Sequence, residues 1–296
     1  MGQQAANTIV LGSSYLLFTL GLSLSWGVLE VLNLAHGAIF MIGAIVAYQV
    51  TKGSDASLVV VLPVAAAAGG ACAVILELVA YRPIRNRLRH SAEGDLRALI
   101  ASVAAASILV AVGDEVTDRN PQSLPPSLFD VHTTTVLGAQ VTNIQLLIVG
   151  LALALTLALA WVVHSTNAGR AMRAFAYDPA TARLLGVSPE RLSVATMFVS
   201  GAMAAAAGVL LAINLNLVSA YMGDGLLLKA FAIIILAGVG SIGGALVAAF
   251  LLAFVEIGVV EYVSSDLKDA VAFALIIVLL LLRPQGLFSR GAWQRA

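Results

Sequence analysis

Charged residues are scarce in this 296-residue sequence: Asp, Glu, Lys and Arg make up 11% of it, against 60% hydrophobic residues. A soluble globular domain has about 25% charged residues, so this composition excludes one. The formal net charge is zero, whereas proteins that bind nucleic acid need a basic surface, and we expect no nucleic-acid partner. The chain is therefore predicted to lie in a lipid bilayer.

Residues that perform chemistry are also few. The single cysteine, Cys72, lies in an apolar run, which excludes a disulfide framework and a cysteine-based metal site. The four histidines are too far apart for a metal signature and no nucleophilic triad is suggested, so we expect no catalytic site, metal or cofactor. The Walker A pattern, G-x-x-x-x-G-K-S/T, does not occur. If ATP drives this protein, a different subunit must bind it.

The basic residues that are present are unevenly placed. Twelve of the sixteen Lys and Arg residues fall in three polar stretches, Arg82 to Arg97, Arg170 to Arg191 and Arg283 to Arg295. Cytoplasmic loops collect Lys and Arg, so all three stretches are predicted to face the cytoplasm. The predicted location is the cell (inner) membrane. In this orientation the N-terminus lies on the outer side, the C-terminus lies in the cytoplasm, and residues 117–142 form an external loop.

Apolar runs near the length of a membrane span, about 20 residues, fill most of the chain. We predict an all-α fold, a polytopic integral membrane protein in which residues 1–296 form a single transmembrane domain of eight or nine helices. The number depends on two broken helices, at Asn33 to Gly37 and at Gly238 to Gly244, because eight crossings require one of these segments to be re-entrant. The runs are Ile9–Leu29, Leu32–Val50, Leu58–Ala80, Ala98–Val116, Ile144–His164, Leu192–Asn214, Leu226–Val239, Gly243–Val260 and Ala270–Leu282.

The two breaks resemble each other. Residues Asn33 to Gly43 and Leu228 to Gly238 each begin with a polar break and continue as an apolar run that ends in glycine. With nine crossings they run in opposite directions, as in an inverted repeat, and paired interrupted segments of this kind indicate a translocation path. Residues Gly238 to Gly243 also fit the dinucleotide pattern G-x-G-x-x-G, but they follow no strand of a soluble βαβ unit. We interpret them as a helix break or a close helix contact.

Polar residues inside spans are costly and are therefore candidates for function. Asn33 and His36 should share a helix face, where they either line the pathway or join helices by hydrogen bonds. Lys229 and Glu256 either form a buried pair between adjacent spans or contact the solute, whereas Glu77 lies near a span end and is expected to be interfacial. The predicted pathway residues are Asn33, His36, Asn214, Asn216, Lys229 and Glu256.

Residues 165–193 form the most structured polar stretch. Asp178-Pro179 predicts the start of a short helix, Gly186 its end, and Ser188-Pro189-Glu190 the start of the next helix. A helix of two turns is marginal alone in water, so its apolar side chains should be seated either in a groove of a cytoplasmic ATPase or against the chain's own spans. The predicted coupling residues are Arg170, Arg173, Asp178, Ala182, Leu184, Leu185 and Gly186.

The external loop contains three prolines and then a β-like stretch, Val131 to Val141, with Leu137-Gly138 at a turn. It is either a structured contact for an external partner or a solvated connector.

Several short blocks follow one another over nearly the whole chain. They are Leu32-Asn33-Leu-Ala-His36-Gly37 with Met41-Ile-Gly43-Ala44, Tyr81-Arg82-Pro83, Gly169-Arg170-Ala-Met-Arg173-Ala with Ala182 to Val187, Lys229-Ala-Phe231 with Gly238 to Gly244, Lys268-Asp269, and Pro284-x-Gly286-Leu287. Together they resemble the permease subunits of branched-chain amino acid ABC importers. The Asn-x-Ala-His-Gly form resembles the first of the two homologous permeases, since the second tends to carry Gly-His-Gly.

The resemblance implies one half of a channel that is completed by a homologous second permease and driven by two cytoplasmic ATP-binding subunits. An extracytoplasmic solute-binding protein would deliver a small-molecule solute. The solute class that the resemblance implies is branched-chain amino acids, with urea, short amides or other small carboxylates as the alternatives. The sequence departs from the family at two places. Many relatives have an acidic residue where this chain has Ala38, and of the Glu-Ala-Ala-x-x-x-Gly loop of other ABC importers only Ala182 and Gly186 are kept.

Two other classes remain open from the residues alone. A secondary carrier or channel that works without ATP shares the apolar spans and inverted repeats, and its ion-coupling carboxylate would have to be Glu256. A structural membrane subunit without a conducting role would leave both helix breaks unexplained.

Overall fold

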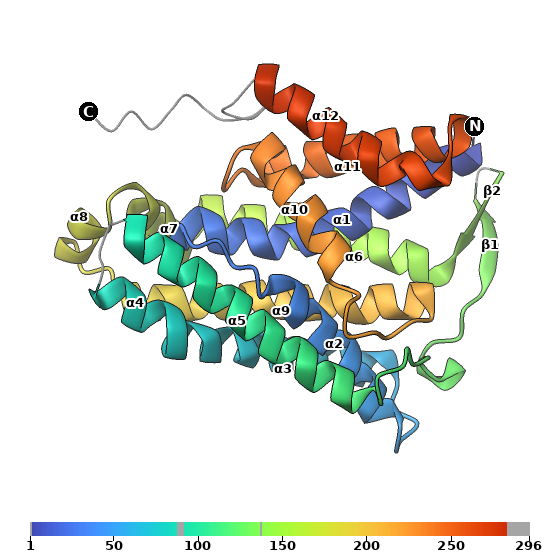
Figure 1. Ribbon diagram of the computed structural model, residues 1–296, viewed down its shortest axis with the longest axis horizontal. Helices are drawn as coiled ribbons and strands as arrows, with labels where there is room; N and C mark the ends of the chain where they lie inside the picture. Colours follow the sequence, from blue (N-terminus) through green and yellow to red (C-terminus); the bar gives the residue numbers. More distant parts are fainter. Residues whose placement is uncertain (1, 88–91, 137, 283–296) are drawn as a thin grey trace.

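The computed structural model describes residues 2–87, 92–136 and 138–282. These residues form a bundle of long helices with a short β-hairpin at one end (Figure 1). The third basic stretch, Arg283 to Arg295, and the block Pro284 to Leu287 lie outside the described residues, as does Leu137 of the predicted turn.

Helices long and apolar enough to cross a bilayer dominate the fold. Within the described ranges there are six, and α2 is a shorter apolar helix. The chain is thus an all-α, multi-pass membrane protein apart from its hairpin. The helices are α1 (Gly2–Leu29), α2 (His36–Thr51), α3 (Leu58–Leu76) continued by η1 (Glu77–Tyr81) and α4 (Arg82–Arg87), α5 (Ala92–Val116), α6 (Asn143–Ser165), α7 (Asn167–Tyr177), α8 (Pro179–Leu184), α9 (Pro189–Leu215), α10 (Asp224–Ala237), α11 (Ile242–Tyr262) and α12 (Lys268–Leu282), with short 3₁₀ turns η2 (Pro126–Leu128) and η3 (Ser265–Leu267).

The bundle has two distinct ends. The N-terminus and the hairpin of β1 (Thr133–Val136) and β2 (Ala139–Thr142) lie at one end, and α4 and α8 lie at the other (Figure 1). Gln3 ties α1 to the hairpin, because its side-chain amide donates to the Gln140 carbonyl at 3.1 Å and accepts from the Gln140 N–H at 2.8 Å. The hairpin confirms the predicted β-like stretch, and Gly138 has the positive φ of +82° that its turn needs.

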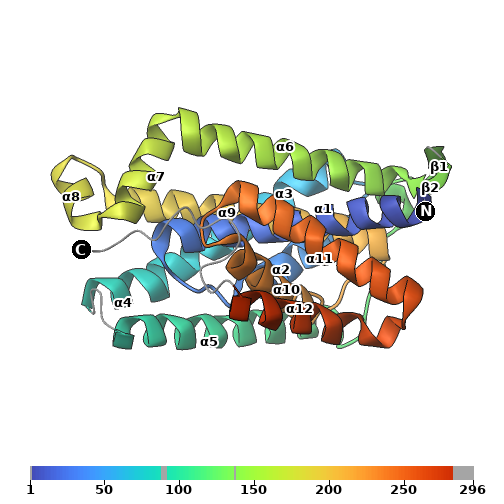
Figure 2. The same ribbon diagram turned by 90° about the horizontal axis from the view of Figure 1, so that it is seen from above.

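Helices α1 and α9 form the interior of the bundle. Their most apolar windows are 78% and 83% buried, against 11% for α5 and 22% for α6. Figure 2 shows α1 and α9 between α6 on one side and α5 on the other. Bulky apolar side chains of α5 and α6 that no part of the bundle covers, such as Ile100, Ile108 and Leu157, suit contact with lipid tails.

Small residues let the interior helices approach closely. A Cβ atom added to Gly43 of α2 would lie 2.1 Å from the Ala205 carbonyl oxygen of α9, and one added to Gly201 would lie 2.4 Å from the Gly69 oxygen of α3. Such distances leave no room for a side chain. In lipid, where apolar burial does not drive helices together, close packing of this kind stabilises a bundle.

Both predicted helix breaks are present. Helix α1 ends at Leu29, where Glu30 takes a left-handed conformation with φ of 56°, and α2 begins only at His36. The second break separates α10 from α11, and its residues Gly238 and Gly240 have φ of +87° and +77°. A chain with side chains at these two positions would be strained, which explains the glycines.

The starts of α2 and α10 touch. Gly223 precedes the first residue of α10, and a Cβ atom added there would lie 2.1 Å from the carbonyl oxygen of Gly37 in the first turn of α2. Neither helix start has a side-chain hydrogen bond at its N-cap residue. The two short helices therefore bring their N-terminal ends together at Gly37 and Gly223.

Candidate functional site

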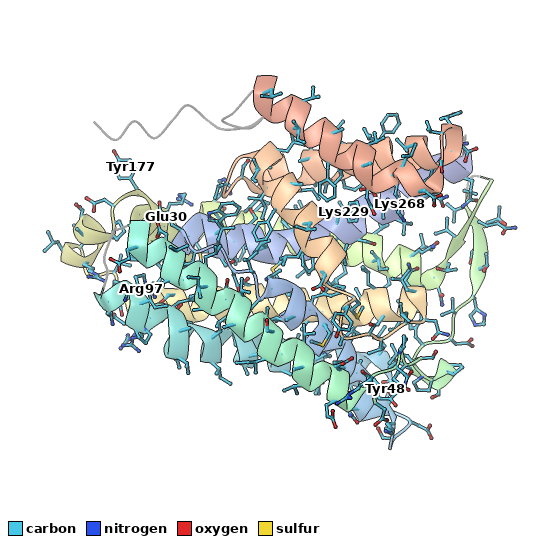
Figure 3. The ribbon with its side chains drawn as sticks, viewed as in Figure 1. Glu30, Tyr48, Arg97, Tyr177, Lys229 and Lys268 are labelled. Atoms are coloured by element: carbon cyan, nitrogen blue, oxygen red, sulfur yellow. The ribbon has the colours of Figure 1, made fainter. Side chains whose placement is uncertain are left out.

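A cluster of charged and polar side chains joins α10 to its neighbours. The Nζ atom of Lys229 on α10 lies 3.0 Å from Oε1 of Glu256 on α11 and 2.9 Å from Oδ1 of Asp269 on α12 (Figure 3). It also donates to the hydroxyl of Tyr15 on α1 at 2.9 Å, and that hydroxyl donates to Oε2 of Glu256 at 2.5 Å. The predicted buried pair of Lys229 and Glu256 is thus part of a larger cluster.

Burial makes this cluster costly to break. The side chains of Lys229 and Glu256 are 13% and 3% exposed, whereas that of Asp269 is half exposed. A buried charge that loses its partner destabilises a protein by about 3–5 kcal/mol. The cluster therefore fastens α10 to α1 and α11, and Asp269 is the member that solvent reaches.

Asn33 lies in the break between α1 and α2 and shapes it. Its side-chain oxygen accepts from the N–H of Ala35 at 3.1 Å and from the hydroxyl of Tyr81 in η1 at 2.9 Å. The first contact is a local turn of the kind that asparagine favours, and the second joins the break to a distant helix.

His36 starts α2 and is fully buried against α1. Its Nε2 atom lies 3.1 Å from the carbonyl oxygen of Phe18, and the two rings meet edge to face at 5.0 Å. The expectation that Asn33 and His36 share a helix face is wrong, because α2 begins at His36 and Asn33 precedes it in non-helical chain. Among the described residues, the Nδ2 atom of Asn33 and the Nδ1 atom of His36 find no hydrogen-bond partner.

The other two predicted pathway residues lie at the end of α9. Asn214 is in its last turn, and Asn216 is the residue after it, with a left-handed φ of 48° that ends the helix. Neither side chain makes a hydrogen bond to Lys229 or Glu256 in the described part of the chain. The structure brings Lys229 and Glu256 together and leaves Asn214 and Asn216 apart from them.

The polar stretch between α6 and α9 folds as its local chemistry predicts. The Asp178 side chain accepts from the N–H groups of Ala180 and Thr181 at 2.8 and 3.1 Å and so caps α8, and Gly186 follows that helix with φ of +88°. Ser188 caps α9 through the N–H of Arg191 at 3.5 Å. These caps confirm the predicted helix boundaries.

The apolar residues of α8 do not share one environment. Ala182 is buried, whereas Leu184 and Leu185 are 88% and 77% exposed. Arg183, which lies between Ala182 and Leu184, is half buried. Two adjacent leucines that the chain's own spans leave uncovered form an apolar surface at the α8 end of the molecule.

Helix α7 connects this surface to the bundle. Met172 and Phe175 are buried, while Arg170 and Arg173 are exposed. Arg173 lines a small cavity together with Gly27 of α1 and Gly240 of the second break. Helix α7 therefore lies beside both of these elements.

The sequence does not reveal the role of Tyr15 or the full burial of Glu77. Tyr15 carries no signal in the sequence, because its partners lie more than 200 residues away. Glu77, which is predicted to lie near a span end, has a side chain that is fully buried and paired with Arg85. The sequence does contain a signal for this pair, because Glu77 is an acidic residue inside an apolar run and Arg85 follows it by eight residues. In the described part of the chain, no three His, Cys, Asp or Glu side chains are placed to hold a metal ion.

Comparisons with known proteins agree with this architecture. Residues 4–280 match the family described as "Branched-chain amino acid transport system / permease component". The LivH permease protein of the high-affinity branched-chain amino acid transport system of Escherichia coli is 34% identical, over 97% of this chain and 95% of its own. The corresponding BraD protein of Pseudomonas aeruginosa is 30% identical over the same shares.

A more distant relative matches only part of the chain. The LsrC permease protein of the autoinducer 2 import system of an Enterobacter strain is 33% identical over 45% of this chain and 38% of its own. No solved structure gives a significant match.

Proposed function

This chain belongs to the family of branched-chain amino acid transport permeases, and from that premise we propose which solute it moves, with which partners and by which parts. It is one permease subunit of an ATP-driven importer, and its solute is a branched-chain amino acid. Family membership sets aside the secondary carrier that works without ATP. Its proposed partners are a homologous second permease, two cytoplasmic ATP-binding subunits and an extracytoplasmic solute-binding protein.

The exposed leucine pair of α8 carries the proposal of energy coupling. Leu184 and Leu185 lie uncovered at the end of the bundle that also holds α4, and the sequence has no Walker A pattern for binding ATP. An apolar pair on a short, capped helix suits a groove in a partner protein. We assign that groove to an ATP-binding subunit, and Arg170, Arg173, Asp178 and Gly186 to the segment that presents the pair.

The proposed arrangement has nine crossings, with the N-terminus outside and the C-terminus in the cytoplasm. Its support is the separation of the hairpin from α4, α7 and α8, which carry Arg82, Arg85, Arg170, Arg173 and Arg183 (Figure 1). In this arrangement α2 and α10 are the corresponding short helices of an inverted repeat.

The proposed pathway runs beside the place where the starts of α2 and α10 meet. The N-terminal end of a helix carries a partial positive charge. The start of α2 has no side-chain cap and no acidic residue in its first turn, so it favours a solute with a carboxylate, whereas α10 already has the carboxylate of Asp224 in its first turn. Asn33 and His36 lie at the start of α2, while Lys229 and Glu256 hold α10. We propose that these residues gate or line the route.

Uptake by the assembled importer tests the solute class. The four kinds of subunit would be reconstituted in vesicles, and uptake of leucine, isoleucine and valine would be compared with that of urea and short amides. We expect ATP-dependent uptake of the three amino acids, each reduced by an excess of the others. Uptake of urea or an amide without any response to leucine would overturn this assignment.

A further inference from the structure

An ion pair between a fully buried carboxylate and a partly exposed guanidinium group lies between the start of α9 and the bundle core. Both carboxylate oxygens of Glu77 accept hydrogen bonds from the guanidinium group of Arg85, and Glu77 is fully buried. The Nη2 atom of Arg85 also donates to the Ser193 hydroxyl at 3.3 Å. Ser193 lies in the first turns of α9, five residues after the N-cap Ser188, so Arg85 contacts the helix that directly follows α8.

The same turn of helix reaches the first break. Glu77 begins η1 and Tyr81 ends it, and Tyr81 is fully buried with its hydroxyl donating to Oδ1 of Asn33 at 2.9 Å. That oxygen also accepts the N–H of Ala35, the residue directly before α2. Polar contacts therefore run from the start of α9 through one turn of helix to the start of α2.

This turn is π-helical and not α-helical. The N–H of Arg82 donates to the carbonyl of Glu77, five residues back, whereas the α-helical pattern uses four. Isolated π-helical turns within α-helices are rare and occur mostly at functional sites. Because such a turn can revert to the α-helical pattern by shifting its hydrogen bonds, it can rotate Tyr81 relative to Glu77 with little other change.

We propose that Ser193, Arg85, Glu77, Tyr81 and Asn33 form a polar connection that transmits the position of the α8–α9 segment to the break between α1 and α2. This inference rests on the proposed function and names positioning residues for its energy coupling. Glu77 follows Arg85, since leaving the fully buried carboxylate without its cation is strongly unfavourable. Displacement of the start of α9 therefore moves η1 and changes the contact of Tyr81 with Asn33, which shapes the start of α2.

The substitution Tyr81→Phe removes the hydroxyl and keeps the ring. The test is the number of solute molecules imported per ATP hydrolysed by the reconstituted importer. We expect this ratio to fall about fivefold, the factor that corresponds to one neutral hydrogen bond of about 1 kcal/mol, while the subunits stay assembled and hydrolysis continues. The matched control is Tyr48→Phe, because the Tyr48 hydroxyl binds Gln122 at the hairpin end, far from η1 (Figure 3).

The second variant acts at the other end of the connection. Ser193→Ala removes the hydroxyl that Arg85 contacts, and alanine is the residue best tolerated in a helix. The same fall in the ratio is expected, and this variant decides the matter if Tyr81→Phe does not assemble. The double variant should lose no more than the worse single variant, since residues of one connection are not additive.

Wild-type ratios in both single variants would overturn the proposal, as would losses that add in the double variant. The proposed function fails separately, because that failure would appear in the unsubstituted importer as ATP hydrolysis without any response to solute.

Discussion

The Nζ atom of Lys229 and the Oε1 atom of Glu256 lie 3.0 Å apart, between α10 and α11 and almost out of reach of solvent. A single substitution, Lys229→Met, leaves the carboxylate buried without its cation. The expected loss is about 3–5 kcal/mol in the free energy of unfolding, measured by thermal unfolding of the solubilised protein.

Two control variants show whether that loss comes from the buried charge. Lys268→Met removes an exposed lysine at the start of α12, next to Asp269 of the cluster (Figure 3). It should change the free energy of unfolding by less than about 0.5 kcal/mol. The double variant Lys229→Met/Glu256→Met removes both charges and should recover part of the loss, because paired removal of buried charges is often neutral. Equal stability of Lys229→Met and Lys268→Met would show that the cluster does not fasten α10.

The close approach of α2 and α9 predicts a sharp response to one methyl group. Gly43→Ala would place a Cβ atom 2.1 Å from the Ala205 carbonyl oxygen, so the helices must separate. Overpacking of this kind costs about 1–3 kcal/mol, which thermal unfolding detects. Gly53→Ala is the control, because its Cβ atom would meet nothing within 4 Å. A Gly43→Ala protein as stable as this control would contradict the packing described.

His36 tests the proposed pathway. The substitution His36→Leu keeps an apolar contact with Phe18 but removes the Nε2 contact with the Phe18 carbonyl oxygen. Transport should fall while the complex stays assembled, since a polar side chain buried in a membrane protein indicates function. His36→Gln can restore a donor and should retain more activity. Transport by His36→Leu at the unsubstituted rate would leave His36 with only a packing role.

The proposed orientation predicts which end of the bundle an impermeant thiol reagent reaches. In a Cys72→Ala background, single cysteines at Ser123, before the hairpin, and Ala180, on α8, are both exposed. Reagent added to intact cells should label the cysteine at 123 and not the one at 180, because the proposed orientation puts the basic stretches in the cytoplasm. The reverse pattern would invert the orientation.

Features set by local chemistry were predictable from the sequence. The caps at Asp178 and Ser188 depend on a side chain that binds backbone groups two or three residues away, and the break at Gly238 and Gly240 depends on backbone angles that glycine alone adopts freely. Each of these signals is contained in a few consecutive residues.

Features set by tertiary packing were not predictable. Tyr15 meets Lys229 across 214 positions, and the burial of Glu77 depends on Arg85 folding back along the helix. Asn33 does not share a helix face with His36, because the chain before α2 is not helical. Likewise, the periodicity of a two-turn helix does not reveal that Ala182 turns inward while Leu184 and Leu185 remain exposed.

Solute-stimulated ATP hydrolysis of a Leu184→Glu importer in vesicles tests the central claim most directly. Leu184 is uncovered in the permease, so the substitution should not disturb its folding. A glutamate carried into an apolar groove instead costs several kcal/mol, on the order of an unpaired buried charge. We predict loss of solute-stimulated hydrolysis and of the ATP-binding subunits on purification, with Leu184→Met and Val131→Glu of the hairpin end unaffected. Normal stimulation and full recovery of the ATP-binding subunits with Leu184→Glu would contradict the assignment of α8 as the coupling element.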